Sequence, residues 1–428
     1  MSGGGGGGWS PEDGRSGRGG GGRRDRRGGV GGAPAVAAAV AVAVGLALAT
    51  VWAAHSGGRE EVHATLSLAE TLGGADTAGY RRAAGPRPFR FPADHGPHPG
   101  FRTEWWYVTG NLEAADGRRF GYQLTFFRKA LSPRRPDLDS DWSTSQAWMA
   151  HLAVTDPAAG RFRAFERFDR QALGLAGARE GPFRVWLGDW RLAKAGEAGD
   201  GGAFPMSLTA AAGEVSLDLV LEPVKGPVLQ GEGGLSRKGP DPGDASYYYS
   251  FPRLRTTGRI RTAAGPVTVR GTSWLDREWS TSVLPERVAG WDWFGLQLDD
   301  GRELMVYVLR RRDGSPEPFS AGVLVDPEGH PHRLDADAFR IDPLGRWESP
   351  VGGTSYPSGW RVQVPGAGLD LRVVPVLRDQ ELDLSFRYWE GAVDVKESEG
   401  TGGVTGVGYV ELTGYGEGSG RSTAGAVG

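Results

Sequence analysis

The 428-residue sequence contains no cysteine. This absence excludes disulfide frameworks, thiolate zinc sites, cysteine nucleophiles and iron–sulfur clusters. A large excess of either charge is missing too, since 49 Lys and Arg nearly balance 52 Asp and Glu. We therefore expect no nucleic-acid partner, because phosphate binding needs a clustered positive surface.

The sequence also lacks the short motifs of two large enzyme classes. It has no Gly-x-Ser-x-Gly nucleophile elbow, and the glycine-rich run at 231–234 lacks the strand-to-helix context of a phosphate-binding loop. A serine hydrolase and a nucleotide enzyme are therefore disfavoured. Two histidine pairs, His95 with His98 and His330 with His332, lie in loops without suitably placed carboxylates. We expect no metal site and no cofactor.

The N-terminal region has three parts of different composition. Residues 1–32 are rich in Gly and Arg, which predicts a disordered tail. Residues 33–54 carry no charge, and at about 1.5 Å per residue a helix of this length would span roughly 33 Å, enough for a bilayer. This pattern is typical of a secretory signal peptide or of an uncleaved membrane anchor. Either one places the folded part outside the cytoplasm, after a linker at residues 55–85.

The pattern changes to short alternating segments from residue 86 onward. Apolar residues recur at every second position in several segments, and convincing helical periodicity is scarce. This alternation predicts an all-β protein built of antiparallel barrels or sandwiches. The clearest runs are Phe120, Tyr122, Leu124 and Phe126; Val215, Leu217, Leu219 and Leu221; and Leu304, Val306 and Val308.

An internal repeat supports two domains. The segment starting at Trp105 and the segment starting at Trp291 each hold an Asp-Gly turn between two alternating strands, at Asp116-Gly117 and Asp300-Gly301. Asp-Gly between such strands is a strong hairpin signal. The repeat predicts two barrels from a duplicated unit, although two unrelated hairpins would give a similar pattern. Thirteen of the 15 Trp lie between Trp105 and Trp389, where they could fill a barrel interior or line its mouth.

Several motifs resemble the carotenoid 1,2-hydratase (hydroxyneurosporene synthase) superfamily, in particular its bacterial branch of predicted secreted hydrolases. They are FPADHGPHP running into FRTEWWYVTGNL at 91–112, YYYS at 247–250, WLDREWS at 274–280, WDWF at 291–294 and GYVELTGY at 408–415. The resemblance implies two tandem lipocalin-like β-barrels, at residues 86–280 and 281–417, before a disordered tail at 418–428. It also implies relatives that hydrate isoprenoid double bonds or cyclise apolar polyenes. Arg277 stands where the hydratases tend to have His, so a mechanism that requires this His does not carry over.

Hydrating an isolated alkene needs a strong acid, a shielded site for the cation and a guided water. Asp276 is the first candidate for the acid, and Glu104 is the next. Glu278 would share a face with Asp276 on a strand, so the two carboxyls could share a proton. His151 is a further candidate acid–base group, and Tyr248 could donate a hydrogen bond into the site. The candidate ligand-binding aromatic residues are Trp105, Trp106, Trp274, Trp291 and Trp293, whose faces would stabilise a cation.

Each candidate also has a purely structural interpretation. Asp276 and Glu278 could form salt bridges with Arg residues, and His151 could be a hydrogen-bonded core residue. Three functions remain open on this basis. The first is an extracytoplasmic enzyme acting on an apolar isoprenoid or polyene-like molecule, the second is a non-catalytic lipophile carrier at the cell surface, and the third is a secreted hydrolase. The expected partner is an apolar small molecule, together with the membrane if the segment at 33–54 is not cleaved.

Overall fold

The computed structural model describes residues 77–134, 143–196, 202–282, 284–398 and 403–416. These residues form 25 β-strands and two short 3-10 helices, Ala93–His95 and Pro365–Ala367, and they contain no α-helix. The prediction of an all-β protein is therefore confirmed. The two predicted tails, the apolar segment at 33–54 and most of the linker lie outside the described residues. Within the described part of the chain, no helix is long and apolar enough to cross a membrane.

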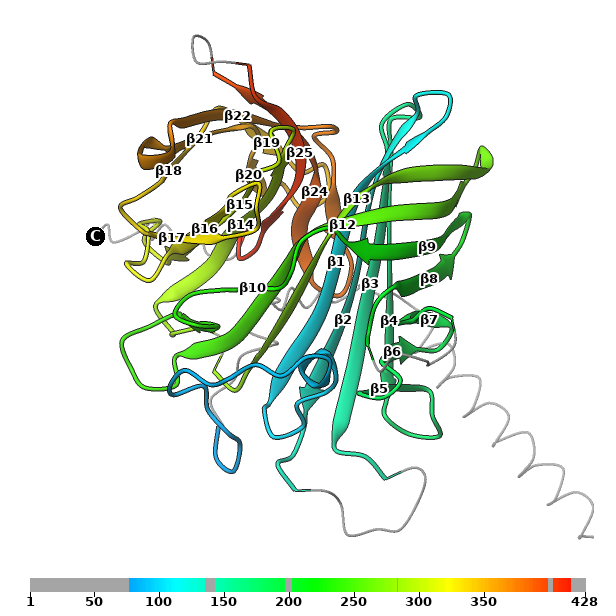
Figure 1. The fold of residues 1–428 in the computed structure, drawn as a ribbon, viewed down its shortest axis with the longest axis vertical. Coiled ribbons are helices and arrows are strands. Elements are labelled where there is room, and N and C mark those ends of the chain that lie inside the picture. The colour runs from blue at the N-terminus through cyan, green and yellow to red at the C-terminus, as the bar shows by residue number, and fades with distance from the viewer. Residues whose placement is uncertain (1–76, 135–142, 197–201, 283, 399–402, 417–428) are drawn as a thin grey trace, which may run out of the picture. The chain divides into compact units, whose positions relative to one another are not determined.

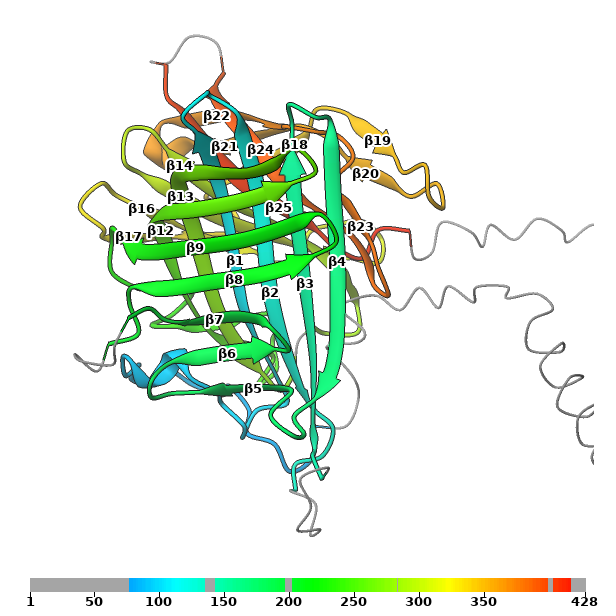
Figure 2. The ribbon, with the colours of Figure 1, turned by 90° about the vertical axis from the view of Figure 1, so that its right-hand side faces the viewer.

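The first sheet, called barrel 1 below, curls on itself (Figure 1). It encloses its own hydrophobic core. Its strands are β1 (Thr103–Ala114), β2 (Arg119–Ala130), β3 (Gln146–Asp156), β4 (Arg161–Arg170), β5 (Ala176–Arg179), β6 (Arg184–Leu187), β7 (Trp190–Lys194), β8 (Met206–Ala212), β9 (Val215–Pro223), β10 (Val228–Leu229), β11 (Leu235–Arg237), β12 (Ala245–Thr262) and β13 (Gly265–Ser280). Their order is β4-β3-β2-β1-β13-β12-β9-β8-β7-β6-β5, and β10 and β11 both pair with β12. Strands β5–β9 run across strands β1–β4 (Figure 2).

The second sheet, called barrel 2, has the order β17-β16-β15-β14-β25-β24-β22-β21-β18, and β23 pairs with β24. Its strands are β14 (Val288–Leu298), β15 (Glu303–Arg311), β16 (Ala321–Val325), β17 (Pro331–Asp335), β18 (Arg340–Pro343), β21 (Trp360–Val364), β22 (Leu369–Pro375), β23 (Glu381–Asp383), β24 (Arg387–Glu397) and β25 (Thr405–Leu412). A small separate hairpin consists of β19 (Arg346–Glu348) and β20 (Ser355–Pro357). Barrel 2 also encloses its own apolar core. The expected pair of barrel-like antiparallel sheets is thus present.

The central strands of both barrels are buried on both faces. Successive side chains of a strand point to opposite faces. Along β1, Trp106 and Val108 therefore belong to the core of barrel 1, whereas Trp105 and Tyr107 join an apolar cluster shared with barrel 2. In β14, Phe294 lies in the core of barrel 2 and Trp293 in the shared cluster. The shared cluster joins the outer faces of the two barrels.

The predicted hairpins are present at both Asp-Gly turns. Strand β1 pairs with β2 around Gly117, and β14 pairs with β15 around Gly301. Both glycines have a positive φ, +82° and +89°, a conformation that disfavours other residues. In each turn the Asp side chain accepts the amide proton of the Arg two residues later, over 3.1 Å at Arg118 and 3.0 Å at Arg302.

The repeat extends beyond the hairpins. Strand β13 pairs with β1 and places Asp276 opposite Tyr107. Strand β25 pairs with β14 in the same way and places Glu411 opposite Trp293. Since Tyr107 and Trp293 occupy matching positions of the two hairpins, Asp276 and Glu411 are equivalent positions of the two barrels.

Two side-chain amides show the same two-fold relation between the barrels. Asn111 of β1 donates to the carbonyl of Gly408 in β25 over 3.1 Å, and Gln297 of β14 donates to the carbonyl of Ser273 in β13 over 3.0 Å. Ser273 precedes Asp276 by three residues (276 − 273), and Gly408 precedes Glu411 by three (411 − 408). The barrels therefore exchange the same contact in both directions.

Candidate active site

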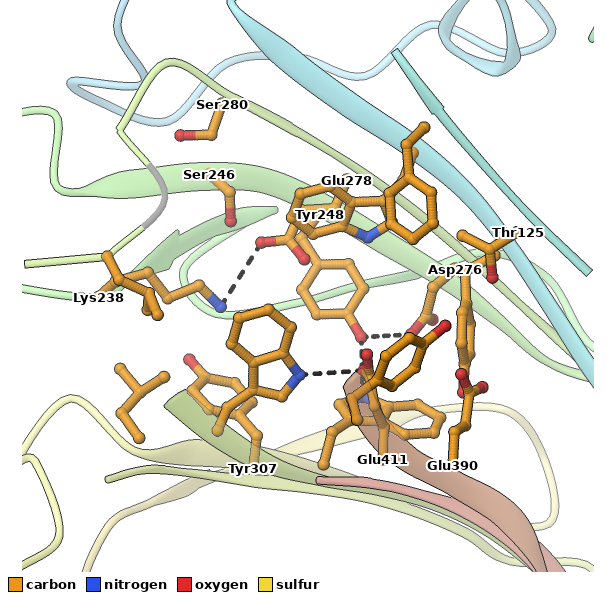
Figure 3. A pocket seen from close by; sticks show the side chains of 18 residues that line it. Thr125, Lys238, Ser246, Tyr248, Asp276, Glu278, Ser280, Tyr307, Glu390 and Glu411 are labelled. Atoms are coloured by element: carbon orange, nitrogen blue, oxygen red, sulfur yellow. Dashed lines mark hydrogen bonds and ion pairs between the residues drawn. The ribbon is translucent and has the colours of Figure 1, made fainter. Parts of the chain in front are cut away.

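A cavity lies between the two barrels, at the surface where their outer faces meet (Figure 3). Its volume, counted for the centres of water molecules, is about 70 Å³, several times the roughly 10–15 Å³ that one water requires. The lining residues come from both barrels: Trp105, Tyr107, Thr125, Phe127, Lys238, Ser246, Tyr248, Asp276, Glu278, Ser280, Leu284, Trp291, Trp293, Tyr307, Leu309, Tyr388, Glu390 and Glu411.

The position of the cavity corrects one expectation from the sequence. We expected the aromatic residues to fill a barrel interior or to line its mouth, where an apolar ligand would lie. The interior of each barrel is instead filled by its own apolar core. The aromatic residues of the cavity project from the outer faces of central strands, so the site needs both barrels.

Asp276 is buried and accepts three hydrogen bonds. Tyr248 Oη donates to Oδ2 over 2.5 Å, Trp274 Nε1 donates to Oδ1 over 2.6 Å, and Ser250 Oγ also donates to Oδ1. Burial raises the pKa of Asp276 to about 7, although these three hydrogen bonds act to lower it and the neighbouring Glu278 raises it further. The carboxyl can therefore hold a proton near neutral pH and give it up within the cavity.

Tyr248 connects Asp276 to the aromatic wall. Its hydroxyl donates to Asp276 and accepts from Trp293 Nε1 over 3.2 Å. The neighbouring residues Tyr247 and Tyr249 point the other way, into the core of barrel 1. The alternation along β12 thus places Tyr248 as the sequence led us to expect.

Glu278 lines the cavity on the same face of β13 as Asp276, and its charged neighbour is Lys238. Lys238 Nζ lies 3.6 Å from Glu278 Oε1 and 4.2 Å from the ring centre of Tyr307, and it donates to Ser236 Oγ over 3.0 Å. Burial lowers the pKa of Lys238, but Glu278 and Tyr307 outweigh it and the net pKa is raised. Lys238 therefore stays charged and is a cationic group of the cavity.

Barrel 2 contributes two further carboxyls, Glu390 and Glu411. They lie opposite each other in the pairing of β24 with β25. Burial raises the pKa of Glu411 to about 7, although Trp291 Nε1 donates to it over 3.0 Å. Burial, and then the charge of Glu411, raise the pKa of Glu390 well above its usual value. The cavity thus holds two carboxyl groups from each barrel.

Three tryptophans expected at the site do line the cavity: Trp105, Trp291 and Trp293. The ring of Trp293 packs edge-on against Tyr107, with 5.4 Å between ring centres, and against Trp274, with 5.9 Å. Trp274 lies behind the wall, where it donates to Asp276. Aromatic faces in a cavity with buried acids suit an apolar ligand on which positive charge develops.

The structure does not bring Glu104 or Trp106 into the cavity. Both lie on the face of β1 that points into barrel 1. Trp106 donates to the carbonyl of His95 over 2.9 Å, and the Arg277 guanidinium lies 3.8 Å from the centre of its ring. Glu104 is fully buried and forms ion pairs with Arg128 and Arg277. Burial would raise the pKa of Glu104, but these arginines and His98 hold it below its usual value, so Glu104 is not an acid at neutral pH.

His151 lies behind the cavity wall. Its Nδ1 is 2.7 Å from the hydroxyl of Tyr388, which does line the cavity. Burial lowers the pKa of His151 to about 3, so the ring is neutral. Its Nε2 has no hydrogen-bond partner in the described part of the chain. His151 therefore contacts the cavity lining through Tyr388 and through the ring of Phe127, with 5.4 Å between ring centres.

Sequence reasoning missed Lys238, Glu390 and Glu411. Glu411 lies within the GYVELTGY motif already noted, and its alignment with Asp276 through the repeat was the signal that could have revealed it. Glu390 then follows as its cross-strand neighbour. Lys238 carries no such signal, because it follows a short strand in a loop. Among the described residues, no group of three or more His, Asp or Glu could hold a metal ion.

The fold and the cavity together define a tandem-barrel protein with a lipocalin-like architecture and a carboxyl-lined cavity between its barrels. The profile of the AttH-like family matches residues 82–415. The chain therefore belongs to the AttH-like family, and this confirms the family resemblance drawn from the motifs. A comparison with curated protein sequences gives no match.

Several solved structures are similar to this chain, among them two crystal structures. A crystal structure described as an AttH from Nitrosomonas europaea is 36% identical, with a TM-score of 0.69, and the match covers 78% of this chain and 99% of that one. Kievitone hydratase from Nectria haematococca is 14% identical, with a TM-score of 0.59, and the match covers 79% of this chain and 96% of that one. The similarity to kievitone hydratase shows that the two proteins share a fold.

Proposed function

We propose that the protein acts outside the cytoplasm on an apolar, isoprenoid or polyene-like molecule bound between the barrels, by acid-catalysed hydration or cyclisation. The observation that carries this proposal is the state of Asp276. It is a buried carboxyl with a pKa of about 7, it lies in the wall of an aromatic cavity, and three donors orient it. A general acid works best when its pKa lies near the operating pH.

The geometry suggests how the reaction proceeds. The Asp276 carboxyl donates its proton to one alkene carbon, and the two π electrons form the new C–H bond. The faces of Trp105, Trp291 and Trp293 stabilise the resulting cation, by about 0.5–2 kcal/mol each. Attack by water and loss of one of its protons then give an alcohol, whereas attack by a second double bond of the same molecule and loss of a proton give a cyclic isomer. In both cases the proton lost makes up for the one that Asp276 gave. Lys238, beside Glu278, would hold a polar end of the ligand.

The shared fold also supports the proposal. The kievitone hydratase with the same fold is, by its name, a hydratase. The extracytoplasmic location rests on the apolar segment at 33–54, and cell fractionation of the full chain tests it directly. Recovery of the protein with the cytosol, unchanged by deletion of residues 33–54, would contradict the location.

The activity is tested with the ligand that the protein retains. The purified full chain is extracted with organic solvent, and mass spectrometry identifies the apolar molecule released. This molecule is then incubated in ¹⁸O-labelled water with the wild type or with Asp276→Asn. The proposal expects a product that has gained one labelled water, or a cyclic isomer of unchanged mass, with the wild type and not with Asp276→Asn.

The alternative functions give different results in the same experiment. An unchanged ligand in the wild-type reaction would overturn the enzymatic proposal in favour of a carrier. Two fragments, one bearing the label, would identify a hydrolase. Equal turnover by the wild type and Asp276→Asn would remove Asp276 from the mechanism.

A further inference from the structure

The carboxyls of Glu390, which is buried, and Glu411, which is half-buried, form a pair that has no cationic partner in the described residues. Glu390 is 1% exposed, and neither of its carboxyl oxygens has a hydrogen-bond partner in the described residues. Glu411 accepts from Trp291, and the two side chains are direct cross-strand neighbours. Like charges at such positions repel each other. Two close carboxylates that are shielded from bulk water resist ionising together near neutral pH, and sharing one proton is the usual solution.

The repeat shows what is particular about this pair. In barrel 1, Ser250 lies opposite Asp276 and donates a hydrogen bond to it. In barrel 2, the equivalent position opposite Glu411 holds Glu390. Barrel 2 therefore has a second carboxyl where barrel 1 has a hydroxyl donor. A carboxylate at this position can only accept hydrogen bonds. The pair must therefore carry a proton of its own, whereas in barrel 1 the serine hydroxyl donates the hydrogen bond.

We propose that Glu390 and Glu411 share one proton and act as the base of the cavity, across the barrel interface from Asp276. This inference rests on the proposed function. Asp276 gives its proton to the alkene carbon, water forms the C–O bond, and one proton of the bound water passes to the pair. The pair then holds two protons and Asp276 holds none. Transfer of one proton back through cavity water restores the starting state, so the net reaction consumes the alkene and one water.

The surroundings of the pair agree with this role. Beyond burial itself, the charges of Asp276 and Glu278 from β13 raise the pKa of Glu411, whereas the phenols of Tyr107 from β1 and Tyr388 from β24 lower the pKa of Glu390 without offsetting its burial. Tyr409 of β25 lies near it as well. All of these groups are acids or phenols. Lys238 forms its ion pair with Glu278, and in Figure 3 Lys238 lies on the left of the cavity while Glu390 lies on the right. A single negative charge on the pair would also stabilise the cation.

Infrared titration of the full chain tests the shared proton without any ligand. The protonated carboxyl band is followed against pH in the wild type, Glu390→Gln and Glu411→Gln. We expect each substitution to shift the titration of the remaining carboxyl to lower pH, because its neighbour's charge is gone. Glu381→Gln is the matched control. Glu381 is a buried carboxyl of barrel 2 outside the cavity, held by Ser349 and Tyr356, and its loss leaves the pair's titration unchanged.

Two results would overturn the inference. The first is that each substitution removes one band and leaves the midpoint of the other carboxyl in place. The second is that Glu411→Gln keeps the full rate in the labelled-water assay, where we expect a loss of about 10²–10⁴-fold. The proposed function stands in both cases if Asp276→Asn is inactive. If the wild type itself does not turn over the ligand, the proposed function and the base role fail together, whereas the shared proton is still decided by the titration.

Discussion

At Asp276, burial and hydrogen bonding act on one carboxyl in opposite directions. The three donors that surround it would favour the carboxylate, but removal from water favours the neutral acid and dominates. The same residue type at the protein surface, Asp116, has its pKa lowered by hydrogen bonds from Arg118. The chemistry of the side chain is therefore set by its place in the fold.

A buried acid of this kind makes stability depend on pH. The pKa of Asp276 is about 7 in the folded protein, against 3.8 for an ordinary, unperturbed Asp side chain. Between these values the unfolded chain has lost the proton that the native state keeps, so stability falls as pH rises. Asp276→Asn cannot ionise. We expect its free energy of unfolding at pH 8 to exceed that of the wild type by up to about 4 kcal/mol, which raises its melting temperature, with a smaller gain near pH 4. Calorimetry at several pH values checks this, and a pH-independent difference would contradict it.

Arg277 illustrates the opposite case, a buried charge that is structural. It donates to Glu104 and to the carbonyls of Trp105 and Gly96. Arg277→Met leaves the fully buried Glu104 with fewer partners, so we expect a loss of about 3–5 kcal/mol in urea unfolding. Arg255→Met is the control, because its pair with Glu222 is exposed and should contribute no more than about 1 kcal/mol. Equal losses would contradict the distinction.

At the scale of strands, alternation and the Asp-Gly turns were sufficient to predict the all-β fold and both hairpins. The cavity was harder to predict, because central strands are buried on both faces and the sequence does not show which face meets the other barrel. Trp105 and Trp106 were both expected at the site, yet adjacent residues of one strand point to opposite faces. Strand β13 places Glu278 opposite Trp105, so Trp105 is the one of the two that faces the cavity. Glu390 could be recognised only once β24 was known to pair with β25.

The interface between the strands of the two barrels depends on Gln297 more than on Asn111. Gln297 is buried, donates to the carbonyls of Pro252 and Ser273, and accepts from Thr272. We expect Gln297→Leu to destabilise the protein by about 1–3 kcal/mol, because buried polar groups lose their partners. Asn111→Leu removes one hydrogen bond at a half-buried site and should cost less. Chemical unfolding of both variants checks the order, and the reverse order would contradict it.

At the scale of the whole molecule, the two barrels are joined without any disulfide. Two apolar clusters and the reciprocal amides connect their outer faces. Since the two apolar clusters are buried in the same way as each core, we expect the barrels to unfold together. Differential scanning calorimetry of the full chain should give one cooperative transition. Two separable transitions would show that each barrel is stable by itself.

The central claim is that the ligand lies between the barrels and not inside either one. Ser246 is buried on β12 and lines the cavity, whereas Thr257 is exposed on the same strand. Ser246→Phe should fill the cavity, and Thr257→Phe should leave it open. Mass spectrometry of organic extracts is the direct test: the account predicts that the wild type and Thr257→Phe release the same apolar molecule and that Ser246→Phe releases little or none. Equal amounts from all three proteins would contradict it.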